Sequence, residues 1–494
     1  MSSAAAICCP AVLSIPSILL VRIREKDPGG IGCSPLRFAF NGVLSSLASV
    51  DAIALLVCCR LLARSLSPEL LTQWREVAAD VLAIASDDGI LRVVRVEQGG
   101  AGPTFPHPGP ITLCAWSPCG SVLATGGDDC SLRFVRVEAG GPMPEILHNG
   151  RLGFVEWSPS GELIASSCET EDCLLRIIDV ATGSLRVSVD HGKMVAALGW
   201  SSCGSRIVTV CEQRVQALQA LGSQVTADTK LNVIDATSGC VWQLDHGSPI
   251  VSLACSPEPP LVATGTEDGL IRIVDCANQV VLQIVPLLGR IRPLLWDPSG
   301  AKRLVAVCCG GFLGSENGVG RDEQWSCIHS VNVESGVVEW KFNLQKRVSP
   351  LRWSPNGKFI AMACHREADV WLLDPSSGCV SHIIRQSGVA VYFAWSPAGD
   401  VLATIEPCCA DGVHLRLVEA SSGRLLHEFK CPEHVEHSSF SGEVISWSPS
   451  GRFLAVVWCY DLDEEYSELV RVFSVSSGKL RLQFHCDDHV RALS

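Results

Sequence analysis

The chain is short of positive charge. Of its 494 residues, 39 are Lys or Arg and 52 are Asp or Glu, which gives a formal net charge of −13 at pH 7. A surface of this sign repels phosphate backbones and anionic lipids, so we expect no nucleic-acid partner and no general membrane binding. Apolar residues nevertheless make up 47% of the chain, enough to build a large folded core.

Motifs for catalysis are also missing. The sequence has no Gly-x-Ser-x-Gly, no phosphate loop ending in Gly-Lys-Ser/Thr, no His-Glu-x-x-His and no Cys-x-x-Cys pair. Cys431, His434 and His437 lie at intervals of three, as zinc ligands can, but a structural zinc site normally shows a second group of paired ligands. We therefore expect a protein that is not an enzyme, with no catalytic residue, no cofactor and no metal.

A clean membrane span is the third absence. Residues 1–21 carry no charge but include Pro10 and Pro16, and the apolar stretch 38–66 contains charged residues. No basic residue precedes the first stretch, so it matches a secretory signal poorly. We interpret residues 1–70 as an atypical apolar segment, either a degenerate repeat or an appendage, and keep a membrane anchor as the alternative.

Cysteine is abundant, with 25 residues, but its pattern does not suit disulfides. The count is odd, and four pairs are adjacent in sequence, as in Cys308-Cys309, so the two side chains of a pair point to opposite faces of a strand. Free thiols indicate a reducing compartment. We expect a cytoplasmic protein, with the nucleus as the alternative.

One pentapeptide, Trp-Ser-Pro-x-Gly, recurs along the chain. Its full or degenerate copies begin at Trp116, Trp157, Trp200, Cys255, Trp296, Trp353, Trp395 and Trp447. The shorter intervals are about 42 residues, a period typical of propeller blades. Within each unit, short apolar runs of period two alternate with tight turns, which predicts four antiparallel strands per unit. A single meander cannot bury both faces, so the units must pack on one another.

These residues resemble the WD40 repeat family of β-propellers. The resemblance rests on the Trp-Ser-Pro-x-Gly turn, on the Leu-Arg-Ile-x-Asp-x-x-x-Gly pattern that ends at Gly183, and on a His before first strands, as at His107. It implies an all-β propeller of four-stranded blades over residues 71–494. It also implies a non-catalytic scaffold for protein-protein interactions within a multiprotein complex. The family's Trp-Asp pair is replaced by Ile178-Asp179 and similar pairs, which weakens its hydrogen-bonded network.

The number of blades stays open at this stage. Beyond the eight pentapeptides, a further unit runs from Trp74 through Leu91, and the chain ends on His489–Ser494, which reads as a first strand without its partners. We predict that this terminal strand completes the first blade and so removes an open sheet edge. The count is then eight or nine, with seven still an option.

The repeats differ from one another on one side only. In a meander, the turns between strands 1 and 2 and between strands 3 and 4 share one face, here called the uniform face because its turns are short and alike. The opposite, variable face holds the longer connections, at 212–229, 309–326, 429–442 and 458–468. Length variation on one face of a repeat protein indicates a binding surface for partners.

Basic residues gather where first strands begin on the variable face. They are Arg151, Lys193, Arg290, Arg292, Lys346 and Arg347, and an acidic group, Asp461, Asp463 and Glu464, lies in the same face's last connection. We predict that these nine residues bind a partner, with the basic ring selecting an acidic or phosphorylated peptide. The plainer interpretation, ordinary polar loops, stays open.

Three functions therefore remain after the sequence alone. The first is a scaffold that binds proteins or peptides, and the second is a trafficking propeller tethered to a membrane or coat by its N-terminal segment. The third, an enzyme with its active site at the mouth of the channel, requires convergent titratable groups that the sequence does not show.

Overall fold

A computed structural model describes residues 80–494, apart from 98–99, 138–142, 169–172, 216–223, 259, 311–324, 345, 347, 365–368, 386–391, 408–412, 431–444, 463–464, 487–489 and 494. All the elements of regular secondary structure in these residues are β-strands, which confirms the expected all-β fold. The segment 1–70 and its boundary at residue 71 lie outside the described residues and stay predictions.

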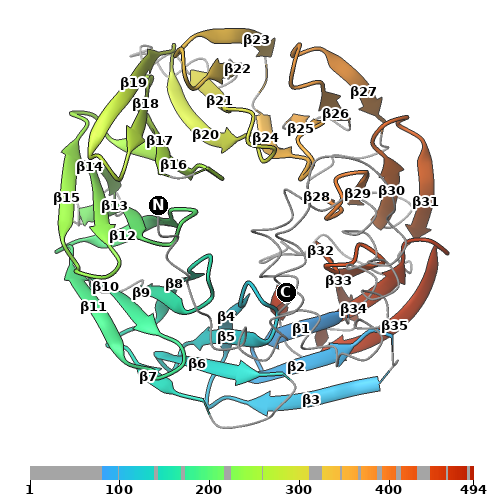
Figure 1. The fold of residues 1–494 in the computed structure, drawn as a ribbon. Coiled ribbons are helices and arrows are strands. Elements are labelled where there is room, and N and C mark those ends of the chain that lie inside the picture. The colour runs from blue at the N-terminus through green and yellow to red at the C-terminus, as the bar shows by residue number, and fades with distance from the viewer. Residues whose placement is uncertain are drawn as a thin grey trace, which may run out of the picture. The chain divides into compact units, whose positions relative to one another are not determined.

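The strands form nine sheets of four antiparallel strands, arranged as blades around a central channel (Figure 1). The inner strands, next to the channel, are β36 (Val490–Leu493), β4 (Ile111–Trp116), β8 (Leu152–Trp157), β12 (Met194–Trp200), β16 (Ile250–Cys255), β20 (Arg290–Trp296), β24 (Val348–Trp353), β28 (Tyr392–Trp395) and β32 (Ile445–Trp447). The second strands are β1 (Val81–Ser86), β5 (Val122–Gly127), β9 (Leu163–Cys168), β13 (Arg206–Val215), β17 (Leu261–Thr266), β21 (Arg303–Gly310), β25 (Ile360–Cys364), β29 (Val401–Pro407) and β33 (Phe453–Leu462).

The third and fourth strands complete each blade toward the rim. The third strands are β2 (Ile90–Arg95), β6 (Ser131–Arg136), β10 (Leu174–Asp179), β14 (Gln224–Asp235), β18 (Leu270–Asp275), β22 (Trp325–Asn332), β26 (Val370–Leu373), β30 (Val413–Glu419) and β34 (Glu465–Ser474). The outer strands are β3 (Gly100–Pro106), β7 (Glu145–Leu147), β11 (Leu185–Asp190), β15 (Val241–Asp245), β19 (Val280–Pro286), β23 (Val338–Leu344), β27 (Val380–Ile384), β31 (Leu425–Lys430) and β35 (Lys479–Cys486).

The two ends of the propeller meet in the first blade. The C-terminal strand β36 pairs antiparallel with β1, with Leu493 opposite Ile84 and Val490 opposite Ser86, while β2 and β3 complete the sheet. This confirms the prediction that the last residues form the inner strand of the first blade. The blade count, open in the sequence, is nine.

The core of the propeller is divided among the blade interfaces. Each of nine buried apolar clusters is shared by two neighbouring blades, and together they run once round the ring. One cluster packs Leu132 of β6 against Leu152 of β8, and another closes the ring by packing Ile84 of β1 with Val470 of β34. Because every sheet buries both faces in this way, apolar residues follow one another in the second and third strands without strict alternation.

The repeated Trp also acts between blades. The indole Nε1 of Trp157 donates to Ala115 O of the preceding inner strand at 3.1 Å, and Trp200 and Trp296 do the same to Glu156 O and Ala254 O at 3.1 and 2.8 Å. Each bond satisfies a buried donor and fixes the distance between two inner strands. The contact between each of these blades and the preceding blade thus explains why Trp recurs at this position.

The Ser-Pro-x-Gly turn has a defined hydrogen-bond pattern. In the copy at Ser158, Gly161 N–H donates to Ser158 O at 2.9 Å and Leu163 N–H donates to Ser158 Oγ at 3.1 Å. Gly161 has a φ of +75°, a conformation that favours glycine. The Ser and the Gly of the turn thus each have a local structural role, which favours the same short turn in successive blades.

Candidate interaction site

The variable face carries hairpins of unequal length. The strands β5 and β6 have 6 residues each, whereas β13 and β14 have 10 and 12 and β33 and β34 have 10 each. The sequence predicts long connections at 212–229 and 458–468. The structure shows that much of this length is paired strand instead, because cross-strand pairing continues to Val215 opposite Gln224 and to Leu462 opposite Glu465. The fourth and ninth blades therefore extend their ladders beyond those of the other blades.

Under this face, a histidine in each of four blades holds the second strand. Nε2 of His107, His148, His191 and His246 lies 2.9, 2.9, 3.3 and 2.7 Å from the hydroxyl of Thr125, Ser166, Thr209 and Thr264. Burial lowers the pKa of His246 to about 4, with the Arg272 charge adding to the effect, and burial also lowers the pKa of His107 and His191. The lowered pKa values keep the imidazoles of His107, His191 and His246 neutral at physiological pH. The His and Ser/Thr half of the family's network is therefore kept in these blades.

Arginines of the third strands bond to neighbouring turns, strands and connections between blades. Arg133 forms ion pairs with Asp129 at 2.5 Å and Glu145 at 2.6 Å. The guanidinium of Arg272 donates to His246 O at 2.9 Å. Arg133 thus holds the turn between strands 2 and 3 and the outer strand of its blade, and Arg272 holds the connection that leads into its blade.

Three of the predicted basic residues form ion pairs. Arg151 lies 3.1 Å from Asp128 and Arg290 lies 3.2 Å from Glu267, in both cases across the boundary to the preceding blade. Lys193 lies 2.9 Å from Asp228 within the fourth blade. These acidic partners were missed in the sequence, although an acidic residue recurs in turns such as Asp128-Asp129 and Glu267-Asp268.

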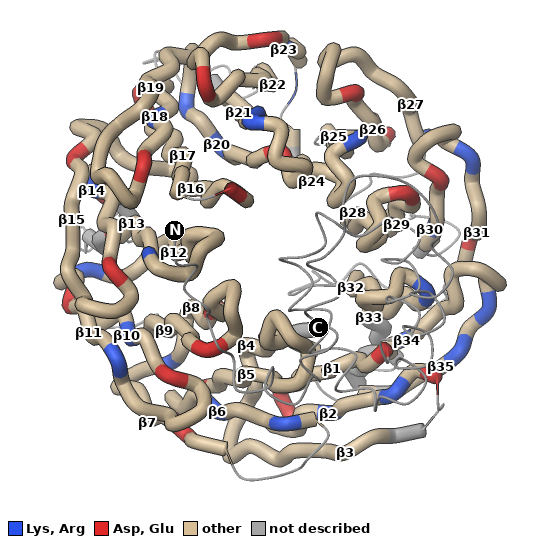
Figure 2. The backbone as a smooth tube through the Cα atoms, in the orientation of Figure 1, with Lys and Arg blue, Asp and Glu red and all other residues tan. Residues whose placement is uncertain are grey.

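The partners of these three bases lower the net positive charge of the predicted ring. Acidic and basic residues are interspersed round the propeller in Figure 2. Because the side chains of Arg151, Asp128, Arg290 and Glu267 are all close to half exposed, their pairs contribute little to stability. They remain accessible to a competing partner.

The other predicted residues divide into described and undescribed positions. Arg292, the third residue of β20, is exposed and forms no ion pair with a described residue, and Lys346 is exposed just before β24. Asp461 lies in β33, while Arg347, Asp463 and Glu464 lie outside the described residues. The assignment of these nine residues to partner binding stays a prediction.

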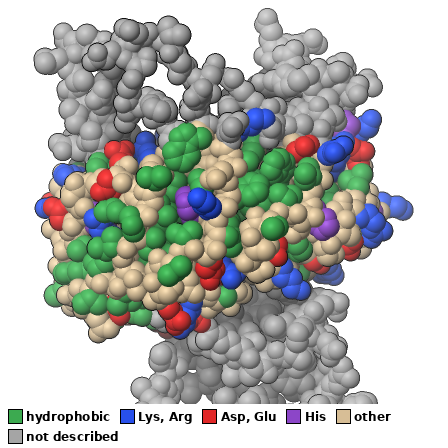
Figure 3. Space-filling view, turned by 90° about the horizontal axis from the view of Figure 1, so that it is seen from above, with side chains coloured by type: hydrophobic (Ala, Val, Ile, Leu, Met, Phe, Trp, Pro, Cys, Tyr) green, Lys and Arg blue, Asp and Glu red, His purple; other side chains and the backbone are tan. Residues whose placement is uncertain are grey.

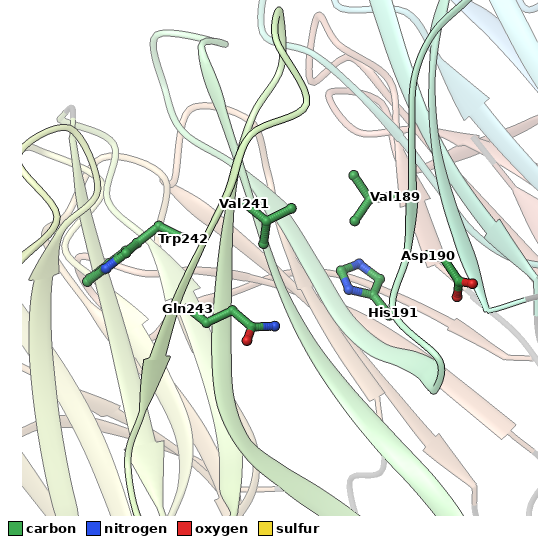
Figure 4. Close-up of a pocket in the computed structure, with 6 residues that line it drawn as sticks. All are labelled: Val189, Asp190, His191, Val241, Trp242 and Gln243. Atoms are coloured by element: carbon green, nitrogen blue, oxygen red, sulfur yellow. The ribbon is translucent and has the colours of Figure 1, made fainter.

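The rim holds a groove between the third and fourth blades. The rim mixes apolar and charged side chains (Figure 3), and a groove of about 360 Å³ lies between β11 and β15. In Figure 4, Val241 and Gln243 point toward Val189 and His191, whereas Trp242 points to the other side of its strand. His191 already bonds Thr209, so its imidazole serves the fold.

The described part of the chain contains many thiols, several of them deeply buried. No disulfide joins the cysteines whose side chains are described, and burial raises the pKa of Cys114, Cys211, Cys255, Cys276 and Cys308 to about 12. Among the described residues, no three His, Cys, Asp or Glu side chains converge as a metal site would require, and no helix is long and apolar enough to cross a membrane. The motif Cys431-x-x-His434-x-x-His437 lies outside these residues.

Comparison with known proteins identifies the repeat and one distant relative. The family described as WD domain, G-beta repeat, matches residues 103–135 and 238–275. Actin-interacting protein 1 of Drosophila melanogaster is 26% identical over 225 residues, which is 37% of this chain and 36% of that protein. The chain thus matches about a third of the length of this curated relative.

Solved structures share the fold at low sequence identity. The dihydro-heme d1 dehydrogenase NirN matches with a TM-score of 0.51 and 10% identity, over 83% of this chain and 74% of that one. The computationally designed Ika8 protein gives a TM-score of 0.49 and 15% identity, over 74% of this chain and 96% of that one. The first of these likenesses concerns the arrangement of blades alone.

Proposed function

We propose that this chain, which belongs to the WD40 repeat family of β-propellers, is a non-catalytic scaffold that binds other proteins through its variable face. The observation that carries the proposal is the contrast between the two faces. On one face, Ser-Pro-x-Gly turns repeat with the same hydrogen bonds, while the other face carries ladders of very different length. A rigid ring that varies on one side only is suited to recognition rather than to chemistry.

The charges of the variable face indicate the chemistry of the partner. Arg292 is an exposed cation without an ion pair in the described part of the chain, and Arg290 beside it is held by Glu267 at a half-exposed position. An acidic or phosphorylated segment can bond Arg292 directly and can compete for Arg290. The described part of the channel mouth therefore supports binding of an anionic peptide at the sixth blade.

Actin is the first partner to test, because the relative that matches this chain is named for its interaction with actin. The match is distant and covers about a third of that protein, so actin binding is a proposal for this chain. Co-sedimentation of the full chain with actin filaments tests it. Recovery of the chain in the pellet in proportion to filament concentration supports actin binding, and recovery only in the supernatant contradicts it.

The scaffold proposal itself is tested by trimming one hairpin. In the variant, residues 459–468 are replaced by the short turn Asp87-Asp88-Gly89 of the first blade, and proteins that co-purify from cells are compared with those of the full chain. We expect the set of partners to shrink while the melting temperature changes little, because the ladder is trimmed beyond the ring. An unchanged set, with the same result after trimming residues 213–226, contradicts recognition through this face. If actin alone is lost from the set of co-purifying proteins, the result concerns this one partner and not the scaffold role.

A further inference from the structure

The outer strand of the fifth blade is unusually apolar where it meets solvent. In β19, Val280, Leu282 and Ile284 are 45%, 48% and 55% exposed, Pro286 is exposed, and the strand carries no charged residue. Leu288, just beyond its end, is 81% exposed. Large apolar side chains left in water in one run are uncommon on a monomeric surface and mark an interaction site.

Other outer strands are protected against such contact. Exposed positions of β11 include Arg186 and Asp190, those of β23 include Glu339 and Lys341, and even β27, which has no charged residue, exposes Ser381. Among the described outer strands, β19 alone has only apolar side chains at its exposed positions. Charged residues on edge strands prevent edge-to-edge association; β19 lacks them and, unlike the uncharged β3 and β27, exposes no polar side chain such as Thr104 or Ser381.

The backbone of β19 also has a free edge. Within the propeller, this strand pairs with β18 only. Leu287 N–H donates to Gly269 O at 2.8 Å, so by alternation the N–H and C=O of Ile284 point away from β18. The bulge at Leu282 and the missing N–H of Pro286 keep this edge short. Side-chain packing, rather than a long ladder, must therefore supply most of the contact.

We propose that β19 is the contact strand of a two-fold symmetric homodimer of this chain, in which the apolar runs of two copies pack antiparallel. A two-fold axis places the same strand on both sides of the contact. Because β19 is uncharged, self-pairing brings no like charges together, whereas the self-pairing of β23 places charged residues against charged residues. Since only one described rim strand has this character, the contact closes at two copies instead of propagating.

The proposed dimer is weak and is favoured by salt. One exposed strand and Leu288 offer far less area than the roughly 800 Å² per partner of stable interfaces, so the dimer must dissociate on dilution. Each copy carries a net charge of −13, and screening this repulsion strengthens an apolar contact. A contact held by ion pairs on the variable face has the opposite salt dependence.

Sedimentation velocity of the full chain from about 1 to about 100 µM, the range in which weak complexes dissociate, tests the proposal. We expect the mass to rise from monomer toward dimer with concentration, and to rise further at higher salt. The variant Leu282→Lys, alone and with Ile284→Lys, is expected to shift the midpoint to at least tenfold higher concentration. The control is Ile383→Lys on β27, whose side chain is also 48% exposed and which is expected to dimerise as the unmodified chain does.

Each outcome decides the proposal. A monomer at all concentrations, or a dimer that persists unchanged in the double variant, overturns it, the second result placing the contact elsewhere on the chain. A dimer lost equally in the Ile383→Lys control overturns the assignment to β19. Because Leu282 and Ile383 are both about half exposed, the melting curves of their variants are expected to match that of the unmodified chain. Hydrogen exchange provides an independent measurement: the amides of residues 280–288 are expected to exchange more slowly at high protein concentration.

Discussion

Arg452 Nη2 lies 3.0 Å from Asp80 Oδ2, although 372 residues separate the two in the chain. Asp80 stands immediately before β1, its side chain is fully buried, and the same oxygen accepts a bond from Ser450 Oγ at 2.8 Å. Arg452 also pairs with Glu97 at 2.7 Å. These bonds join the turn of the ninth blade to the start of the first blade. Side-chain bonds on the uniform face therefore close the ring, in addition to the pairing of β36 with β1.

The ion pair between Arg452 and Asp80 predicts that substitutions of the two residues have coupled effects on stability. Arg452→Ala leaves the buried Asp80 carboxylate without its cation, and we expect the free energy of unfolding to fall by about 2 kcal/mol. Asp80→Ala is expected to cost a similar amount, and the double variant much less than the sum. Urea unfolding of the four proteins measures the coupling. Additive losses, or none, contradict a direct interaction between the two residues.

Deleting residues 489–494 tests the strand closure. Without β36, the inner edge of β1 is unpaired and Val490 no longer packs in the cluster between the ninth and first blades. We expect a loss of about 3 kcal/mol, because ladder bonds and buried apolar surface disappear together. Thermal melting of the deletion variant should show a clear drop, and a curve superimposable on that of the intact chain argues against a shared first blade.

His246 predicts acid sensitivity. Its pKa is about 4 in the folded protein against about 6.5 in an unfolded chain, so between these values only the unfolded state binds the proton. Stability must therefore fall as pH is lowered from about 6.5 to about 4. Melting of His246→Gln and the unmodified chain across this range isolates the effect, because other groups cancel in the difference. Parallel pH profiles for the two proteins contradict a buried neutral imidazole.

Glu156 predicts the opposite dependence. Burial raises the pKa of this carboxyl to about 7, and its Oε2 is buried without a hydrogen bond among the described residues. The folded state therefore holds the proton between about pH 4.5 and about pH 7, and stability falls as pH rises through this range. Glu156→Gln removes that cost, so we expect it to stabilise the protein by about 1–2 kcal/mol at pH 8 and less at pH 5. An equal effect at both values contradicts this assignment.

The sequence is informative about each blade and much less so about contacts between blades. The recurring Ser-Pro-x-Gly predicts the turn between the first two strands because its Ser and Gly make local hydrogen bonds, and the apolar run after His489 correctly predicts the closing strand. The acidic partners of Arg151 and Arg290 lie in the preceding blade, each 23 residues before its base, and the sequence alone does not show that these two positions meet across a blade boundary. The sequence predicts a loop where the long ladder reaches Val215, because the polar residues of this segment resemble a connection.

The central claim, recognition through the variable face, is tested most directly by matched charge reversal. The measurement is the affinity of the full chain for the partner that co-purifies with it. The double variant Arg292→Glu and Lys346→Glu on the variable face is compared with the variant Lys358→Glu on the uniform face. We predict an at least tenfold weaker complex for the double variant and little change for Lys358→Glu, with association slowing as salt rises. Folding should be nearly unaffected in both, because exposed charge reversals alter stability by less than about 0.5 kcal/mol each. Equal losses from the two faces, or an affinity that neither reversal alters, would contradict the account.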